Sequence, residues 1–228
     1  MKKLLLLHGA IGSSHQFEQV AALLKNTFEI HTLDFSGHGG KPIPDAPFSI
    51  ELFANDVLTW MQENKIATID IFGYSMGGYV ALYLAKHHPE KVGNVFTLAT
   101  KFNWNAEGAA REAAMLNPEK IAEKVPAFAK ALEQKHGENW KAVLTNTAEM
   151  MINLGNSPAL PLLSLSEIQQ PVLISVGDKD NMVTLEETIA AYRQIKKGQL
   201  LVLPQTQHPF EKVNAERIAE EIKSYFSE

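Results

Sequence analysis

Ser75 occupies a position where a sharp turn could make it a nucleophile. It lies in Gly73-Tyr74-Ser75-Met76-Gly77-Gly78, between an apolar, β-branched run and a helical pattern. A strand that turns this tightly into a helix strains the residue at its apex, and side chains two positions before and after it would collide with the turn. Both of those positions are glycine, and the amide of Met76 would face negative charge forming beside the hydroxyl. The pentapeptide G-x-S-x-G, residues 73–77, is by itself equally typical of a glycine-rich turn with a bystander serine.

A serine hydroxyl attacks a carbonyl carbon only when a base takes its proton and an acid orients that base. His208 follows the last apolar run of the chain, and Asp178 and Asp180 follow the run before it. Because the carboxyl ends of parallel strands share one edge of a sheet, residues after different strands can meet there. The sequence therefore predicts a site built from Ser75, one of these two aspartates and His208.

Apolar strands and amphipathic helices alternate on both sides of Ser75, which favours an α/β fold. Leu4 to Leu7 are apolar at every position, as expected of a strand that is covered on both faces. We expect a predominantly parallel six-stranded sheet with helices on both faces, its strands being 4–7, 28–35, 68–74, 92–99, 171–176 and 199–203. The expected helices are 15–25 with Ser14 as its cap, 50–64 capped by Ser49, 76–88, 185–195 and 211–226.

The alternation lapses between residues 101 and 166, where only helical patterns occur, interrupted by proline and glycine. We predict a core domain of residues 1–100 and 167–228 and an insertion of three or four helices, residues 101–166.

Five motifs taken together resemble the α/β-hydrolase fold superfamily. In order they are His8-Gly9-Ala10-Ile11-Gly12-Ser13, Asp34-Phe35-Ser36-Gly37-His38-Gly39, Gly73-Tyr74-Ser75-Met76-Gly77-Gly78, Gly177-Asp178-Lys179-Asp180 and Gln207-His208-Pro209-Phe210. The chain order Ser, Asp, His is also that of the superfamily. The sequence departs from the superfamily pattern in two ways. It lacks an antiparallel hairpin before the first parallel strand, and Gln207 stands where a glycine usually precedes the final histidine.

The resemblance implies a role for each matching residue. Asp180, as the last member of a G-x-x-D turn, is the expected acid, and Asp178 is a turn or supporting residue. The backbone N–H groups of Ala10 and Met76 are the expected donors of an oxyanion hole, and the insertion is the expected cap over the site. The resemblance also implies an enzyme that needs no cofactor.

Of the eight histidines, His208 has the position best suited to catalysis. The resemblance assigns His8 and His38 to packing and turn hydrogen bonding, and His136, which precedes Gly137, is expected at a helix terminus. No histidine spacing suggests a metal site, and we predict none.

The insertion supplies aromatic and sulfur-containing side chains suited to an adaptable apolar pocket. They are Phe102, Trp104, Met115, Phe128, Trp140, Met150, Met151 and Leu154, of which we expect Phe102, Trp104, Met150 and Met151 to bind substrate. The leading hypothesis is a serine hydrolase that cleaves a small, mostly apolar carboxylic ester through an acyl-enzyme. The alternatives are a C–C bond hydrolase or lyase resembling the meta-cleavage and menaquinone-pathway enzymes, with Arg111 on a substrate carboxylate, and a ligand-binding receptor on the same fold.

Charge and composition narrow the possible partners. The net charge of −5 gives no reason to expect nucleic acid or an anionic membrane, so the expected partner is a small-molecule substrate. Cysteine is absent, and the apolar run after Lys2 and Lys3 is too short for a secretory signal. These features are those expected of a cytoplasmic protein.

Overall fold

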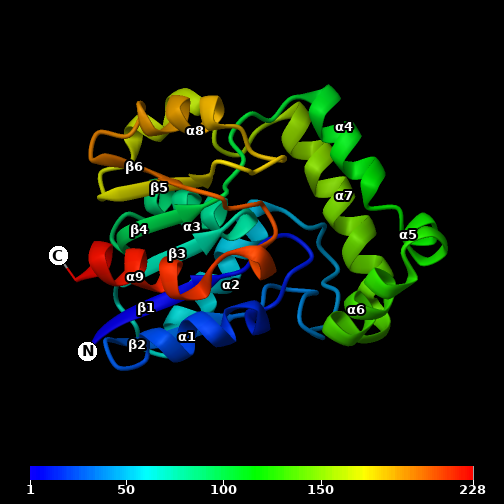
Figure 1. Ribbon diagram of the computed structural model, residues 1–228, viewed down its shortest axis with the longest axis horizontal. Coiled ribbons are helices and arrows are strands. Elements are labelled where there is room, and N and C mark those ends of the chain that lie inside the picture. The colour runs from blue at the N-terminus through cyan, green and yellow to red at the C-terminus, as the bar shows by residue number, and fades with distance from the viewer. Residues whose placement is uncertain (228) are drawn as a thin grey trace.

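A single parallel sheet organises the molecule. The computed structural model describes residues 1–227, and within them the sheet has six strands in the order β2-β1-β3-β4-β5-β6, every neighbouring pair being parallel (Figure 1). The strands are β1 (Lys2–Leu7), β2 (Phe28–Leu33), β3 (Ile69–Tyr74), β4 (Val92–Leu98), β5 (Val172–Gly177) and β6 (Gly198–Leu203). The predicted α/β architecture is confirmed.

The leucines of β1 explain why both faces of the sheet are covered. Leu4 and Leu6 belong to one buried apolar cluster and Leu5 and Leu7 to another, because successive side chains of a strand point to opposite faces. Two helices, α1 (Glu18–Leu24) and α9 (Ala215–Phe226), cover the first face. The other face is covered by α2 (Ile50–Glu63), α3 (Met76–His87) and α8 (Leu185–Tyr192).

The strand register brings the predicted site residues to one edge. Leu7 pairs with Gly73, Tyr74 with Leu98, and Gly177 with Leu203, so that the carboxyl ends of these strands lie level. The segments that follow these ends carry the predicted site residues Ala10, Ser75, Asp180 and His208.

Four helices follow β4 and stand beyond this carboxyl edge, as Figure 1 shows, while both chain termini lie on the opposite side of the sheet. They are α4 (Ala106–Met115), α5 (Pro118–Lys124), α6 (Pro126–His136) and α7 (Trp140–Asn156). Gly155 lets α4 and α7 approach closely, because a Cβ atom there would overlap the side chain of Ala109. No helix within residues 1–227 is both long enough and apolar enough to cross a membrane.

Ser49 caps α2 as expected, because its side chain accepts a hydrogen bond from the amide of Leu52. Two other helices begin differently from the sequence prediction. Ser14 does not cap a helix: its hydroxyl donates to Asp34, and the segment begins as the 3-10 turn η1 (Ser14–Phe17). The last helix begins at Ala215 rather than Glu211, because the side chain of Asn214 caps it after the short turn η4 (Phe210–Lys212).

Candidate active site

Ser75 lies at the apex of a strained turn between β3 and α3. Its backbone has φ 51° and ψ −115°, a conformation that costs a non-glycine residue about 1–3 kcal/mol. The flanking glycines permit the turn, because a Cβ atom on Gly73 would overlap the backbone of Gly77 and one on Gly77 would overlap the carbonyl of Leu7. The carbonyl oxygen of Ser75 is held by the hydroxyl of Thr100 at 3.0 Å. The turn therefore presents the Ser75 side chain at the carboxyl edge of the sheet.

Asp180, rather than Asp178, lies against His208. One carboxylate oxygen of Asp180 accepts a hydrogen bond from His208 Nδ1 at 2.8 Å, and the other accepts from the amides of Met182 and Val183. The Asp180 side chain is fully buried. Asp178 is exposed and accepts a 3.3 Å bond from the amide of Thr206, so it supports the turn.

The second ring nitrogen of His208 faces Ser75. Its Nε2 lies 3.5 Å from Ser75 Oγ. A carboxylate only accepts hydrogen bonds, so Nδ1 carries the proton and the neutral ring has a lone pair on Nε2. Proton transfer requires a distance of about 2.6–3.2 Å, and catalytic hydrogen bonds commonly tighten when substrate binds. His208 Nε2 can therefore take the proton of the Ser75 hydroxyl once it and Oγ move slightly closer together.

Tyr74 holds the loop that carries His208, a role that the sequence analysis missed. Its hydroxyl donates to the carbonyl oxygen of His208 at 2.8 Å, and burial raises the pKa of Tyr74, which keeps it a donor. Gln207 takes part in a separate contact, since its side-chain oxygen accepts from Lys212 at 2.9 Å. The available signal was the position of Tyr74 inside the pentapeptide, directly before Ser75.

The two amides predicted to form an oxyanion hole belong to residues beside Ser75. Met76 is the first residue of α3, and an amide at this position has no acceptor inside its own helix. The loop after β1 lies against the turn, because a Cβ atom on Gly9 would be 2.7 Å from the Tyr74 ring and 3.2 Å from Ser75 Cβ. Ala10 and Met76 both line the cavity in front of Ser75. Their use as oxyanion donors stays a prediction.

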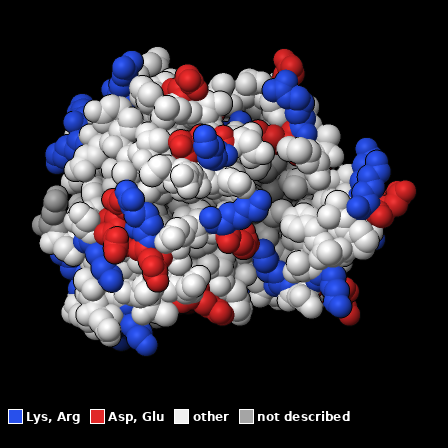
Figure 2. All heavy atoms as spheres, viewed as in Figure 1, with Lys and Arg blue, Asp and Glu red and all other residues white. Residues whose placement is uncertain are grey.

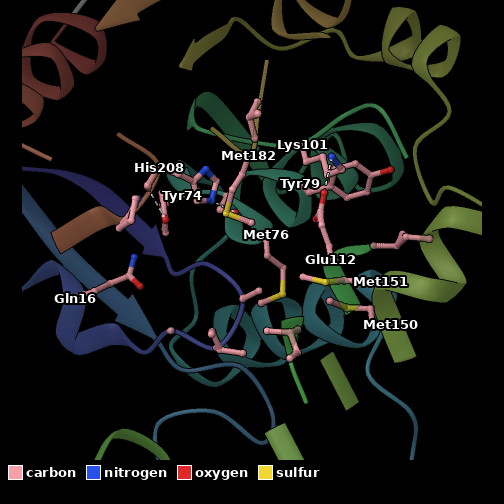
Figure 3. A pocket seen from close by; sticks show the side chains of 18 of the residues that line it. Gln16, Tyr74, Met76, Tyr79, Lys101, Glu112, Met150, Met151, Met182 and His208 are labelled. Carbon is pink, nitrogen blue, oxygen red and sulfur yellow. Dashed lines mark hydrogen bonds and ion pairs between the residues drawn. The ribbon is translucent and has the colours of Figure 1, made fainter. Parts of the chain in front are cut away.

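A cavity of about 330 Å³ opens beside Ser75 and His208, between the sheet edge and the inserted helices, where Figure 2 shows a hollow. Its wall is mostly apolar and rich in methionine, with Met76, Met150, Met151 and Met182 in Figure 3. The wall also contains polar side chains, among them an ion pair: Lys101 Nζ lies 2.9 Å from a carboxylate oxygen of Glu112, on the side away from His208 (Figure 3). The cavity therefore suits a mostly apolar ligand.

The expected substrate-binding residues are only partly brought together. Trp104, Met150 and Met151 line the cavity, and so do Phe128 and Leu154 from the wider set. Phe102 is not among the lining residues, because its ring is buried in the core while its amide donates to Glu187. Met115 is exposed, and Trp140 packs between α5, α6 and α7.

Three other histidines are buried beside this site. His8 donates from Nδ1 to the carbonyl of Gly9 and accepts at Nε2 from the amide of Phe35, which requires the neutral ring. Burial lowers the pKa of His8 to about 3, and it also lowers the pKa values of His38 and His136. Within residues 1–227, no three His, Cys, Asp or Glu side chains are grouped as metal ligands.

Because burial keeps these three histidines neutral, we expect the folded protein to lose stability in mild acid. The unfolded chain binds more protons than the folded one wherever the pH lies between a lowered pKa and the ordinary value of 6.5. The free energy of unfolding should therefore fall as the pH falls from 6.5 to 5.5, by about 1 kcal/mol for His8, with contributions of the same sign from His38 and His136. Urea unfolding at both pH values measures this, with His15→Gln, at an exposed position, as the control that leaves the difference unchanged. Equal unfolding free energies at the two pH values would contradict it.

Comparisons with known proteins agree with this geometry. The family model described as alpha/beta hydrolase fold matches residues 2–134. The pimeloyl-acyl-carrier-protein methyl ester esterase of Neisseria meningitidis serogroup C is 28% identical over an alignment of 237 positions, which covers 92% of this chain and 88% of that protein.

Solved structures share the fold at lower identity. A thermophilic esterase from Thermogutta terrifontis superposes with a TM-score of 0.80 at 20% identity, covering 100% of this chain and 90% of that one. The 2-hydroxy-6-oxo-6-phenylhexa-2,4-dienoate hydrolase of a Rhodococcus species gives 0.81 at 21% identity, covering 100% and 91%. The match of the family model to more than half of the residues, together with the parallel sheet and the strained turn at Ser75, shows that the chain belongs to the α/β hydrolase fold family.

Proposed function

We propose that this α/β hydrolase is a serine esterase that cleaves a small, mostly apolar carboxylic ester through an acyl-enzyme. The observation that carries the proposal is the line of contacts from Asp180 through His208 to Ser75, which ends at an apolar cavity. The arrangement has a nucleophile, a base in the required tautomer and a buried carboxylate to stabilise the base when it is charged.

In the first half of the reaction, Ser75 Oγ attacks the ester carbonyl carbon while His208 Nε2 takes the hydroxyl proton. Negative charge forms on the carbonyl oxygen, and in this proposal the amides of Ala10 and Met76 donate to it. The Asp180 carboxylate stabilises the imidazolium. Collapse of the tetrahedral intermediate breaks the bond to the alcohol oxygen, and His208 returns the proton to that oxygen. The alcohol leaves and an acyl-Ser75 ester remains.

In the second half, water takes the place of the alcohol. His208 removes a proton from the water as its oxygen attacks the acyl carbon, and the same two amides receive the second oxyanion. Breaking the acyl–Ser75 bond with return of the proton to Oγ releases the carboxylic acid. The enzyme is regenerated, and the net change is one ester and one water converted to one acid and one alcohol.

Residues 101–166 act in this proposal as a cap that supplies much of the substrate pocket. Trp104, Met150, Met151 and Leu154 come from this segment and face the cavity, and the flexible methionines can adapt to different apolar groups. The relative named above is a pimeloyl-acyl-carrier-protein methyl ester esterase, which is consistent with ester cleavage as the reaction here.

The alternatives have less support. For C–C bond cleavage of the meta-cleavage type, Arg111 of this chain was the expected partner of a substrate carboxylate. Arg111 instead pairs with Glu107 on the surface and does not line the cavity. Two lysines line the cavity instead: Lys101, beside Trp104, already pairs with Glu112, and Lys135 comes from α6. A receptor would require binding without repeated turnover, which the kinetic experiment below detects.

A panel of p-nitrophenyl esters tests the substrate class. We expect steady turnover of the acetate and butyrate and a fall in kcat/KM with long acyl chains, because a cavity of about 330 Å³ is small for a ligand site. Met151→Trp should lower kcat/KM for the butyrate by about 10-fold or more by filling the cavity. The matched control is Ile152→Trp, at the adjacent exposed position of α7.

Two results would contradict the proposal. Faster cleavage of a meta-cleavage dienoate than of any ester would assign the site to C–C bond hydrolysis. A single stoichiometric burst without steady turnover would favour a receptor.

A further inference from the structure

His136 connects the inserted helices to two loops of the core. It is the last residue of α6 and is buried, with 1% of its surface exposed. Its Nε2 lies 3.0 Å from the carbonyl oxygen of Ile11, and its Nδ1 lies 3.1 Å from the amide of Gly39. A carbonyl only accepts and an amide only donates, so Nε2 carries the proton and Nδ1 accepts. Both ring nitrogens are used, and both partners lie more than 95 residues away in the sequence.

Ile11 directly follows Ala10, whose amide is the proposed oxyanion donor. Its backbone has φ 51°, which is unfavourable for a β-branched residue. The turn is closed by only one backbone bond, from the amide of Gly12 to the carbonyl of Gly9 at 3.1 Å. A strained turn of this kind persists only where its surroundings hold it. The hydrogen bond from His136 to the Ile11 carbonyl supplies such a restraint.

The side chain of Ile11 points to the same helices. It packs against the apolar cluster formed by α5, α6 and α7, whose buried members are Ile121, Ala129, Leu132, Trp140 and Leu144. Two other residues of α6, Phe128 and Lys135, line the cavity. One helix therefore contacts both the space that substrate would fill and the loop that carries Ala10.

We propose that His136 is a positioning residue, which holds Ile11 and thereby keeps the Ala10 amide aimed at the developing oxyanion. The inference rests on the proposed esterase function. It gives the inserted helices a second task, because they would set the rate of the chemical step in addition to enclosing the substrate. Loss of one oxyanion donor typically costs 10²–10³-fold in kcat, and a misaimed donor costs part of that. We therefore expect removal of the His136 hydrogen bonds to lower kcat by about 10- to 100-fold.

Three variants separate this role from simple packing. His136→Phe keeps a planar ring but neither hydrogen bond. His136→Gln offers one acceptor and one donor at a similar reach. Leu132→Ala, one turn earlier on α6, opens the apolar cluster but leaves both hydrogen bonds of His136 available.

The measurements are kcat and KM for p-nitrophenyl butyrate and the rate of labelling by a fluorophosphonate, whose phosphonyl oxygen also uses the oxyanion hole. Unfolding midpoints set a temperature at which every variant is folded. We expect His136→Phe to lower kcat and the labelling rate with KM changed less than 3-fold, and His136→Gln to recover a large part of both. Leu132→Ala should lower the unfolding midpoint while its kcat stays near that of the wild type.

Several outcomes would overturn the inference. They are a His136→Phe enzyme with wild-type kcat, a glutamine variant no better than phenylalanine, and an equal loss of kcat in Leu132→Ala. If His136→Phe does not fold, the glutamine variant is compared with His136→Asn, whose shorter side chain cannot reach both partners, and equal kcat values would overturn it. A wild-type chain that hydrolyses no ester would instead reject the proposed function, and this inference with it.

Discussion

Ser75→Ala is expected to abolish ester hydrolysis and to leave the fold unchanged. The substitution removes one oxygen atom, whose contact in the structure is the 3.5 Å approach to His208 Nε2. The strained backbone is held by other groups, including the Thr100 hydroxyl and the close approach of Gly77 to Leu7, and alanine needs no more space than serine. Removal of a nucleophile of this kind costs at least about 10⁴-fold in kcat. Turnover of p-nitrophenyl butyrate and the urea unfolding midpoint measure the two halves of the prediction.

A matched serine makes this test specific. Ser13 is buried in the loop after β1, close in sequence to Ala10, yet no role in the reaction is assigned to it. Ser13→Ala should keep activity near that of the wild type. A fluorophosphonate should label the wild-type chain once, on Ser75, and mass spectrometry of the digested protein locates the adduct. Undiminished turnover in Ser75→Ala, or an adduct on another serine, would reject the proposed nucleophile.

Asp180→Asn should lower kcat by about 10³- to 10⁴-fold through the tautomer of His208. One oxygen of Asp180 accepts hydrogen bonds from the amides of Met182 and Val183, and the oxygen of an asparagine would keep that position. The asparagine NH2 group would then face His208 Nδ1, where a donor meets a donor. The ring relieves this conflict by moving its proton to Nε2, which removes the lone pair that Ser75 needs.

Asp178→Asn is the matched control, since it changes a carboxylate of the same turn two residues away. Asp178 is exposed and accepts one long hydrogen bond from Thr206, which an asparagine oxygen can also accept. We expect kcat within about 3-fold of the wild type. The comparison uses kcat for p-nitrophenyl butyrate in both variants at the same pH. A larger loss in Asp178→Asn than in Asp180→Asn would exchange the roles of the two residues.

The position of the candidate site at the carboxyl edge of the sheet could be predicted because it depends on local patterns. Four consecutive leucines after Lys3 predict a strand buried on both faces, and Leu4 and Leu5 do pack into clusters on opposite faces of the sheet. The turn at Ser75 was predictable from the two glycines that make room for it. The choice of Asp180 over Asp178 came from resemblance to a family motif, and the 2.8 Å contact with His208 agrees with it.

Residues whose roles depend on distant segments could not be placed in this way. Phe102 and Trp104 are two positions apart, with Asn103 between them, but the ring of Phe102 lies in the core and Trp104 faces the cavity. No periodic element contains both, so their sequence spacing does not indicate which side each one faces. His136 was expected only as a helix terminus, and its contacts with Ile11 and Gly39 arise from the way α6 packs on the core.

The sequence by itself determined which elements form, which of their faces are apolar and which polar residues follow the strands. These properties depend on neighbours within a few residues, through backbone conformation and the periods of strand and helix. The tertiary structure decided which of those polar residues meet, which tautomer His208 adopts and which loop His136 restrains. Hydrogen bonds act over about 3 Å, whereas packing sets the relative positions of segments far apart in the chain, so these contacts exist only once the sheet edge and the inserted helices have come together.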